Sequence, residues 1–259
     1  MISKKIKSIS QYHQLMELPK PEHPLISLIN FENIKNVRSD EKINLMMDIY
    51  SIALKKNFNG RLKYGQQEYD FDEGILTFMA PGQVLSIEVE KNVELKHSGW
   101  LLLIHPDFIW NTTLAKSINQ YAYFGYAVNE ALFLSEKEEA LLVSIMRNIE
   151  QEYHANIDTH SQSIIIAHIE LFLSYAERFY NRQFITRKKI NHQVLDRLEE
   201  VLKDYFSSNN LVHKGLPTVT YIADTLSISP TYLSGLLKSL MGQSTQQHIH
   251  DKLIEKAKE

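Results

Sequence analysis

One face of a short helix near the C-terminal end carries polar groups that could contact DNA. Thr231, Ser234, Gly235 and Lys238 lie at helical spacing between leucines at positions 233, 236, 237 and 240. Leucines at i, i+3, i+4 and i+7 face a protein core, so the other four residues are expected to face outward. Hydroxyl groups can bond to base edges, and an ammonium group can pair with phosphate. These four positions are the candidate DNA contacts.

A second short helix precedes this one, and a tight turn joins the two. Thr220 can cap a helix that continues to Leu226, after which Ser227-Ile228 makes the turn. Ser229 is then a good N-cap, and Pro230 suits the first helical position because its missing N–H costs nothing there. The pattern is typical of a DNA-reading helix pair. It also fits an ordinary pair of packed helices.

Specific residues favour the DNA-reading alternative. They are Ile222-Ala223, Ser229-Pro230, Tyr232-Leu233-Ser234, Leu237-Lys238, Gly242-Gln243-Ser244 and Leu253-Ile254-Glu255-Lys256-Ala257-Lys258. This set closely resembles the first helix-turn-helix of AraC-family transcription regulators. The resemblance implies that Thr231, Ser234 and Gly235 face bases in the major groove and that Lys238 contacts phosphate. Gly235 departs from the family, which usually carries a larger polar or charged side chain there.

The resemblance covers only one of the two units that AraC-type DNA domains contain. A long helix joins the two units in that family, and the sequence stops at Glu259, inside the expected connecting helix. We therefore expect the sequence to be a piece of a longer regulator, with a naturally short regulator as the alternative.

Composition and charge fit a two-part protein. The chain has 259 residues, 44% of them apolar and 23% charged, which is the balance of a globular protein long enough for two domains. From Arg182 onward there are 11 basic and 8 acidic residues, a net charge of +3; the first 181 residues hold 17 and 23, a net charge of −6. A basic C-terminal part after an acidic larger domain suits a DNA reader with a sensor.

Cysteine is absent, which excludes disulfides, thiolate chemistry and cysteine-bound zinc. The longest apolar run, residues 100–104, is far shorter than the roughly 20 residues that a membrane-spanning helix needs. The first residues contain no apolar segment of a signal peptide. We therefore expect a cytoplasmic protein without a membrane partner.

The first half of the chain reads as short strands separated by tight turns. Apolar and aromatic runs alternate with turn formers such as Asn59-Gly60, Pro81-Gly82 and Ser98-Gly99. Such spacing predicts a small barrel or sandwich. The segment from Tyr69 through Gln83 resembles the cupin-like barrel of AraC-type sensor domains. The expected fold is therefore α+β, with a sensor and dimerisation domain at 1–183 and a partial helix-turn-helix domain at 184–259.

A barrel of this kind can hold a small-molecule effector, or its interior can be filled by side chains. Side chains that combine an apolar body with a hydrogen-bonding tip would suit a pocket, and aromatic residues in strands are also common core residues. The candidate ligand contacts are Tyr64, Trp100, Tyr50, Lys63, Phe78 and Lys55, of which Tyr64 and Trp100 rank first.

Catalysis has no visible machinery in the sequence, and we expect no metal, no cofactor and no enzyme activity. Metal-binding cupins use a His-x-His pair with a carboxylate and a further histidine, but His97 and His105 are separate. His248 and His250 form His-x-His on a predicted helix, where i and i+2 point to different sides. No serine lies in a recognisable nucleophile turn.

Helices follow the barrel. Ser135 and Glu138 form a capping-box pattern before one helix, and a second helix runs from about Ser161 to Asn181. Their wide apolar faces predict a homodimer through residues 135–181, although helices that simply cover the barrel would show the same pattern. The segment from Phe184 to Lys189 is the expected linker, and a further helix opens the DNA-binding domain.

The sequence therefore predicts an AraC-like, ligand-responsive transcription regulator that binds double-stranded operator DNA. The first alternative is a metal-independent small-molecule-binding cupin protein, or a cupin enzyme, whose C-terminal helices do not read DNA. The second is a dimerising interaction module without a ligand.

Overall fold

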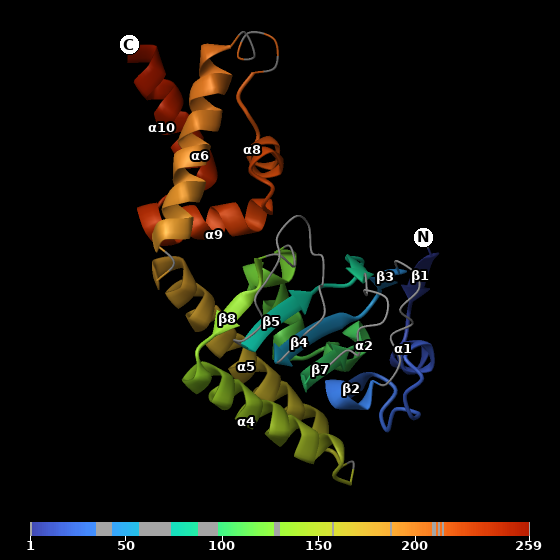
Figure 1. The fold of residues 1–259 in the computed structure, drawn as a ribbon. Helices are drawn as coiled ribbons and strands as arrows, with labels where there is room; N and C mark the ends of the chain where they lie inside the picture. The colour runs from blue at the N-terminus through green and yellow to red at the C-terminus, as the bar shows by residue number, and fades with distance from the viewer. Residues whose placement is uncertain are drawn as a thin grey trace. The chain divides into compact units, whose positions relative to one another are not determined.

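The computed structural model contains two compact units (Figure 1). It describes residues 2–34, 43–56, 74–87, 98–126, 130–156, 158–186, 188–208, 211, 213 and 215–258. Unit 1 comprises Met1–Phe124 and Ala131–Phe179, and unit 2 comprises Gly125–Glu130 and Tyr180–Glu259. The chain is thus divided within a helix, near the predicted end of the first domain at 183. Sequence reasoning did not foresee that the short segment Gly125–Glu130 packs with the C-terminal unit.

Unit 1 is built on two sheets whose strands are short and rich in apolar residues. The larger sheet has the order β2-β7-β4-β5-β8, and every neighbouring pair is antiparallel. The smaller sheet has the order β1-β3-β6, with β1 parallel to β3. The bounds are β1 Ile2–Ile6, β2 Ile26–Asn30, β3 Ile43–Met47, β4 Tyr50–Lys56, β5 Gly74–Met79, β6 Val84–Ile87, β7 Ser98–Ile104 and β8 Leu132–Leu134.

One mainly apolar run of the sequence is divided between two strands. Residues 45–50 contain the end of β3, a bend at Asp48-Ile49 and the start of β4. The bend is held by the Asp48 N–H, which donates to the Ile6 carbonyl at 2.8 Å. A local apolar run cannot reveal this bond because its acceptor lies on another strand.

One apolar core joins the two sheets and helix α1 (Ile9–Leu15). It combines side chains of the smaller sheet, such as Leu45 and Met47, with side chains of the larger sheet, such as Ala53 and Leu103. Because side chains alternate along a strand, this core uses one face of each sheet. The space between the sheets is therefore filled by apolar side chains over the residues of this cluster.

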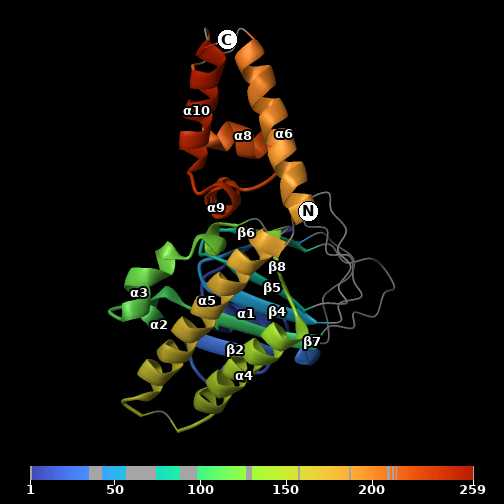
Figure 2. The same ribbon diagram turned by 90° about the vertical axis from the view of Figure 1, so that its left-hand side faces the viewer.

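Helices cover the other face of the larger sheet (Figure 2). Helix α4 (Glu136–Tyr153) begins with the predicted capping box, in which the Ser135 N–H donates to the Glu138 carboxylate at 2.9 Å. Helix α5 (Ser161–Thr186) starts as predicted but continues five residues further. Shorter helices α2 (Pro106–Ile109) and α3 (Thr113–Ser117) precede them, with the 3-10 turns η1 (Phe31–Asn33), η2 (Ile118–Gln120) and η3 (Ala122–Gly125).

Unit 2 is helical. After the end of α5 it contains α6 (Lys188–Ser207), α8 (Val219–Leu226), α9 (Pro230–Met241) and α10 (Thr245–Lys258). Its core is a cluster of buried aliphatic and aromatic side chains from all four helices: Leu198, Leu202, Tyr205, Phe206, Ile222, Ala223, Leu226, Leu233, Leu237 and Ile249. The buried residues of α6, α8 and α9 recur at helical spacing, and for α9 the sequence predicts this stripe.

The predicted linker at 184–189 is instead largely helical. Phe184 is buried, and its carbonyl accepts a hydrogen bond from the Asn191 side chain in α6. Arg187 lies outside the described residues. The rise in charge at Arg187-Lys188-Lys189 suggested an open connection, but packing of Phe184 keeps α5 helical to Thr186.

The mixed α and β composition agrees with the expected fold class, while the cupin-like barrel and helix-turn-helix assignments stay predictions. Over the described part of the chain, none of the helices combines the length and the apolar character that spanning a bilayer requires.

Gly99→Ala should destabilise unit 1 much more than Gly82→Ala. Both glycines have positive φ, 116° and 85°. A Cβ added at Gly99 would lie 2.1 Å from the Leu54 carbonyl oxygen, whereas one added at Gly82 would meet no described atom within 4 Å. We expect Gly82→Ala to lower the free energy of unfolding by about 1 kcal/mol and Gly99→Ala by about 3 kcal/mol or more. Urea unfolding measures both, and equal losses would contradict the pairing of β4 with β7.

Candidate nucleic-acid interface

Local hydrogen bonds set the start and end of the helix that carries the predicted DNA contacts. Ser227 ends α8 in the left-handed conformation, with φ 59° and ψ 38°. The Ser229 hydroxyl accepts from the Tyr232 N–H at 3.1 Å, and Pro230 occupies the first turn of α9. Gly242 ends the helix with φ 72°. These caps agree with the sequence prediction, except that Thr218 caps α8 in place of Thr220.

Three of the four predicted DNA contacts, Thr231, Ser234 and Gly235, lie against other parts of unit 2. The Thr231 hydroxyl donates to the Gly125 carbonyl at 2.9 Å, although the residue as a whole is exposed. The half-buried Ser234 places its Oγ 3.2 Å from the Thr245 Oγ1 at the start of α10. Lys238 is exposed in the last turn of α9. The face predicted to be open is therefore partly covered within its own unit.

Gly235 is placed where a larger side chain would collide with Tyr126. A Cβ added at Gly235 would lie 2.7 Å from the Tyr126 hydroxyl oxygen and 3.5 Å from the Phe184 ring. Tyr126 is 7% exposed, and its ring packs edge-on against Tyr180 and Tyr232 at centroid distances of 5.2 and 5.3 Å. The structure thus gives a packing reason for the glycine that departs from the family pattern.

Glu130 is the main polar residue of this region that sequence reasoning missed. It is 5% exposed, and its two carboxylate oxygens accept from the Ser229 N–H and the Ser229 hydroxyl, each at 2.5 Å. A carboxylate is favoured at a helix N-terminus because the first N–H groups and the helix dipole are positive there. Glu130 lies 99 positions before Ser229. No local sequence pattern marks it.

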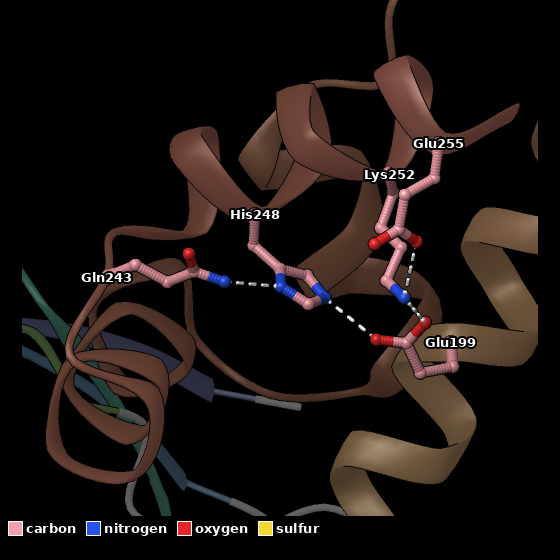
Figure 3. Close-up of polar contacts among 5 residues, drawn as sticks. All are labelled: Glu199, Gln243, His248, Lys252 and Glu255. Carbon is pink, nitrogen blue, oxygen red and sulfur yellow. Dashed lines mark hydrogen bonds and ion pairs between the residues drawn. The ribbon is translucent and has the colours of Figure 1, made fainter. Parts of the chain in front are cut away.

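A second polar network holds α10 against α6 (Figure 3). His248 Nδ1 accepts from Gln243 Nε2 at 2.8 Å, and its Nε2 donates to Glu199 at 2.9 Å. An amide N–H can only donate and a carboxylate can only accept, so Nδ1 is the acceptor and Nε2 the donor in this arrangement. The other Glu199 oxygen pairs with Lys252 at 3.0 Å, and Lys252 also meets Glu255 at 3.1 Å.

These bonds raise the pKa of Lys252 above its usual value. The hydrogen bond to Glu199 has the larger effect, and the hydrogen bond to Glu255 follows. A raised lysine pKa in the folded state adds stability that is complete below the unfolded pKa and is lost as pH rises through the folded value. Since both carboxylate partners of Lys252 are exposed to water, this contribution is small. At neutral pH Lys252 is charged in both states, so its small contribution is fully present.

The predicted effector contacts divide between the two faces of the larger sheet. Strand register places Tyr50, Phe78 and Trp100 on the helix-covered face and Lys55 on the opposite face. Tyr64 and Lys63 lie outside the described residues. The four described side chains therefore do not line one common cavity, because alternation along β4 separates Lys55 from Tyr50.

Packing accounts for most of these four residues. Phe78 is buried with its ring centroid 4.4 Å from Tyr123 and 5.3 Å from Phe124. Tyr50 packs on Phe124 at 5.4 Å, and burial raises the pKa of its phenol. Lys55 Nζ lies 5.8 Å from the Phe31 ring centroid.

Unit 1 contains a hollow that sequence reasoning missed. Its volume is about 640 Å³, and it lies between the loop after α1, strand β2 and the end of α4. Its lining mixes polar groups from all three regions, including His13, Ser27, Asn30, Glu150, Tyr153 and His154. His13 is itself bonded to Ser27 at 2.8 Å and to the Pro19 carbonyl. Within the described ranges, no group of three or more histidine or acidic side chains could hold a metal ion.

Comparisons with known proteins add no assignment. No protein-family model matches the chain, and a search of the curated proteins finds no match. Function is therefore inferred from the residues and their geometry.

Gly235→Ala should fail to stabilise α9, although alanine is favoured in a helix by about 1 kcal/mol over glycine. The added methyl group displaces the Tyr126 hydroxyl, so we expect a net loss in the free energy of unfolding. Tyr126→Phe removes that oxygen, and the double variant should recover about 1 kcal/mol relative to the sum of the single changes. Chemical unfolding of all four proteins measures the coupling. A stabilised Gly235→Ala protein with no coupling would show that the two residues do not meet.

Proposed function

We propose that the chain is a cytoplasmic, ligand-responsive transcription regulator that resembles the AraC family and binds operator DNA through α8 and α9. The observation that carries the proposal is the helix pair itself. Helix α9 has a capped N-terminus after a three-residue turn, and its Leu233 and Leu237 are buried in a core shared with α6, α8 and α10. Thr231, Ser234, Gly235 and Lys238 lie outside that leucine stripe. This geometry supports insertion of the start of α9 into a major groove.

A second candidate function is a metal-independent small-molecule-binding protein whose C-terminal helices do not read DNA. The contacts of Thr231 and Gly235 with Gly125 and Tyr126 favour it, because a partly covered helix face is a poor reader. The hollow beside β2 would offer this protein, or the effector of a regulator, a binding place of ordinary size. The two candidates differ in whether duplex DNA binds at all.

Selection from a pool of random-sequence duplexes, followed by titration at several salt concentrations, separates the candidates. A regulator should enrich a defined sequence, and its log affinity should fall linearly with log salt. Lys238→Gln should weaken binding to all duplexes and lower the magnitude of the salt slope by about one. Lys116→Gln, a change at an exposed lysine of α3 outside the proposed dimer contact, is the matched control and should leave the slope unchanged. Absence of enrichment and of any salt-dependent binding would favour the second candidate.

A homodimer through residues 135–181 is part of the same proposal. The inner sides of α4 and α5 are buried, but Ile164 and Leu171 of α5 remain 40% and 45% exposed. These two residues are seven positions apart and so lie on one helix face. A partner copy could cover them.

Sedimentation velocity at micromolar concentration tests the dimer. We expect the wild-type protein to be a dimer and Leu171→Glu to be a monomer, because a buried, unpaired carboxylate is strongly unfavourable. Ile185→Glu changes an exposed apolar residue outside the proposed contact and should stay dimeric. A monomeric wild-type chain would exclude this part of the proposal.

A further inference from the structure

We infer that Gly125, Tyr126 and Glu130 form a built-in competitor of DNA, which masks the start of α9 until it is withdrawn. The inference rests on the proposed function, and it concerns regulation of the same site. We call Gly125, Tyr126 and Glu130 the latch. Each of the three residues contacts a different position on the face of α9 that is proposed to bind DNA.

Glu130 takes the donors at the helix N-terminus. The Ser229 N–H and hydroxyl both point to its carboxylate. A DNA phosphate at this position would need the same donors, since phosphate and carboxylate are anions recognised by N-terminal N–H groups in the same way. Each donor has one proton, so Glu130 and a phosphate exclude one another.

Gly125 and Tyr126 cover the positions proposed to read bases. The single hydroxyl proton of Thr231 is used by the Gly125 carbonyl. The Tyr126 hydroxyl lies so close to Gly235 that only a glycine fits beside it. A larger polar residue, as AraC-type regulators usually carry there, would push the latch away, so Gly235 and Tyr126 form a matched pair.

Buried groups hold the latch in this position. Tyr126 packs between Tyr180 and Tyr232, and the Glu130 main-chain carbonyl accepts from the Tyr180 hydroxyl at 3.3 Å. The chain on either side of the latch, Phe124 and Ala131, belongs to unit 1. A change in unit 1 that moves η3 or β8 would therefore act directly on the latch through the covalent chain.

A reversible crosslink tests the latch, because the chain contains no cysteine. A Cβ built on Gly125 would lie 3.7 Å from the Thr231 Cβ, which matches the spacing of a disulfide. Gly125 also lacks the positive φ that would disfavour a side chain. The Gly125→Cys/Thr231→Cys protein is oxidised, and its affinity for a fluorescein-labelled mixed-sequence duplex is compared before and after reduction. Each single cysteine variant, treated identically, controls for the substitutions.

We expect the crosslink to form readily and the oxidised protein to bind DNA at least about tenfold more weakly than the same protein after reduction. Failure to form the crosslink would show that the latch contact is not populated. Equal affinities in the two redox states would show that the latch does not mask the DNA-binding face. Either result overturns the inference while leaving the proposed function standing.

A second variant tests the latch without a crosslink. Glu130→Gln keeps the shape of the side chain but removes its charge, so it should raise DNA affinity about threefold or more. Glu200→Gln removes the same charge from an exposed position of α6 and controls for a general loss of repulsion. If Glu130→Gln only matches Glu200→Gln, the inference fails. If no variant and no redox state binds any duplex, the proposed function fails and the inference with it.

Discussion

A carboxylate can be buried only where hydrogen bonds replace the water that it loses, and Glu130 meets this condition at the start of α9. The Ser229 N–H and hydroxyl donate to its two oxygens, and the N–H is one of the backbone groups that a helix N-terminus leaves without a partner inside the helix. The position of α9 in unit 2 therefore depends on a pair of residues from distant parts of the chain. The aromatic contacts of Tyr126 and the hydrogen bond of Thr231 follow from this placement.

The same constraint connects the two candidate functions. A helix whose N-terminal donors are already used cannot bind phosphate with them, which favours a protein that does not read DNA. A bond between an anion and a helix N-terminus is also reversible, and a competing phosphate offers the same chemistry. The contacts of Gly125, Tyr126 and Glu130 with α9 argue against a helix that is always free to bind DNA. The same contacts would allow a protein whose DNA binding is regulated.

Unit 1 obeys a different constraint, the alternation of side chains across its larger sheet. One face packs against the smaller sheet and α1, and the other is covered by α4 and α5. Aromatic residues such as Phe78 lie on the face covered by helices, where Phe78 packs on Tyr123 and Phe124. Polar lining gathers instead beside β2, in a hollow formed by segments that are far apart in the sequence.

The sequence alone determined the local elements, because their causes act over a few residues. Leucine spacing predicted the buried stripe of α9, Ser229 and Pro230 predicted its start, and Ser135 with Glu138 predicted the start of α4. Tertiary structure alone decided which groups meet across long separations. It paired Glu130 with Ser229 over 99 positions, placed Tyr126 against Gly235, and set Lys55 and Tyr50 on opposite faces of the sheet. Such contacts depend on how the whole chain packs, and no periodicity or capping pattern encodes them.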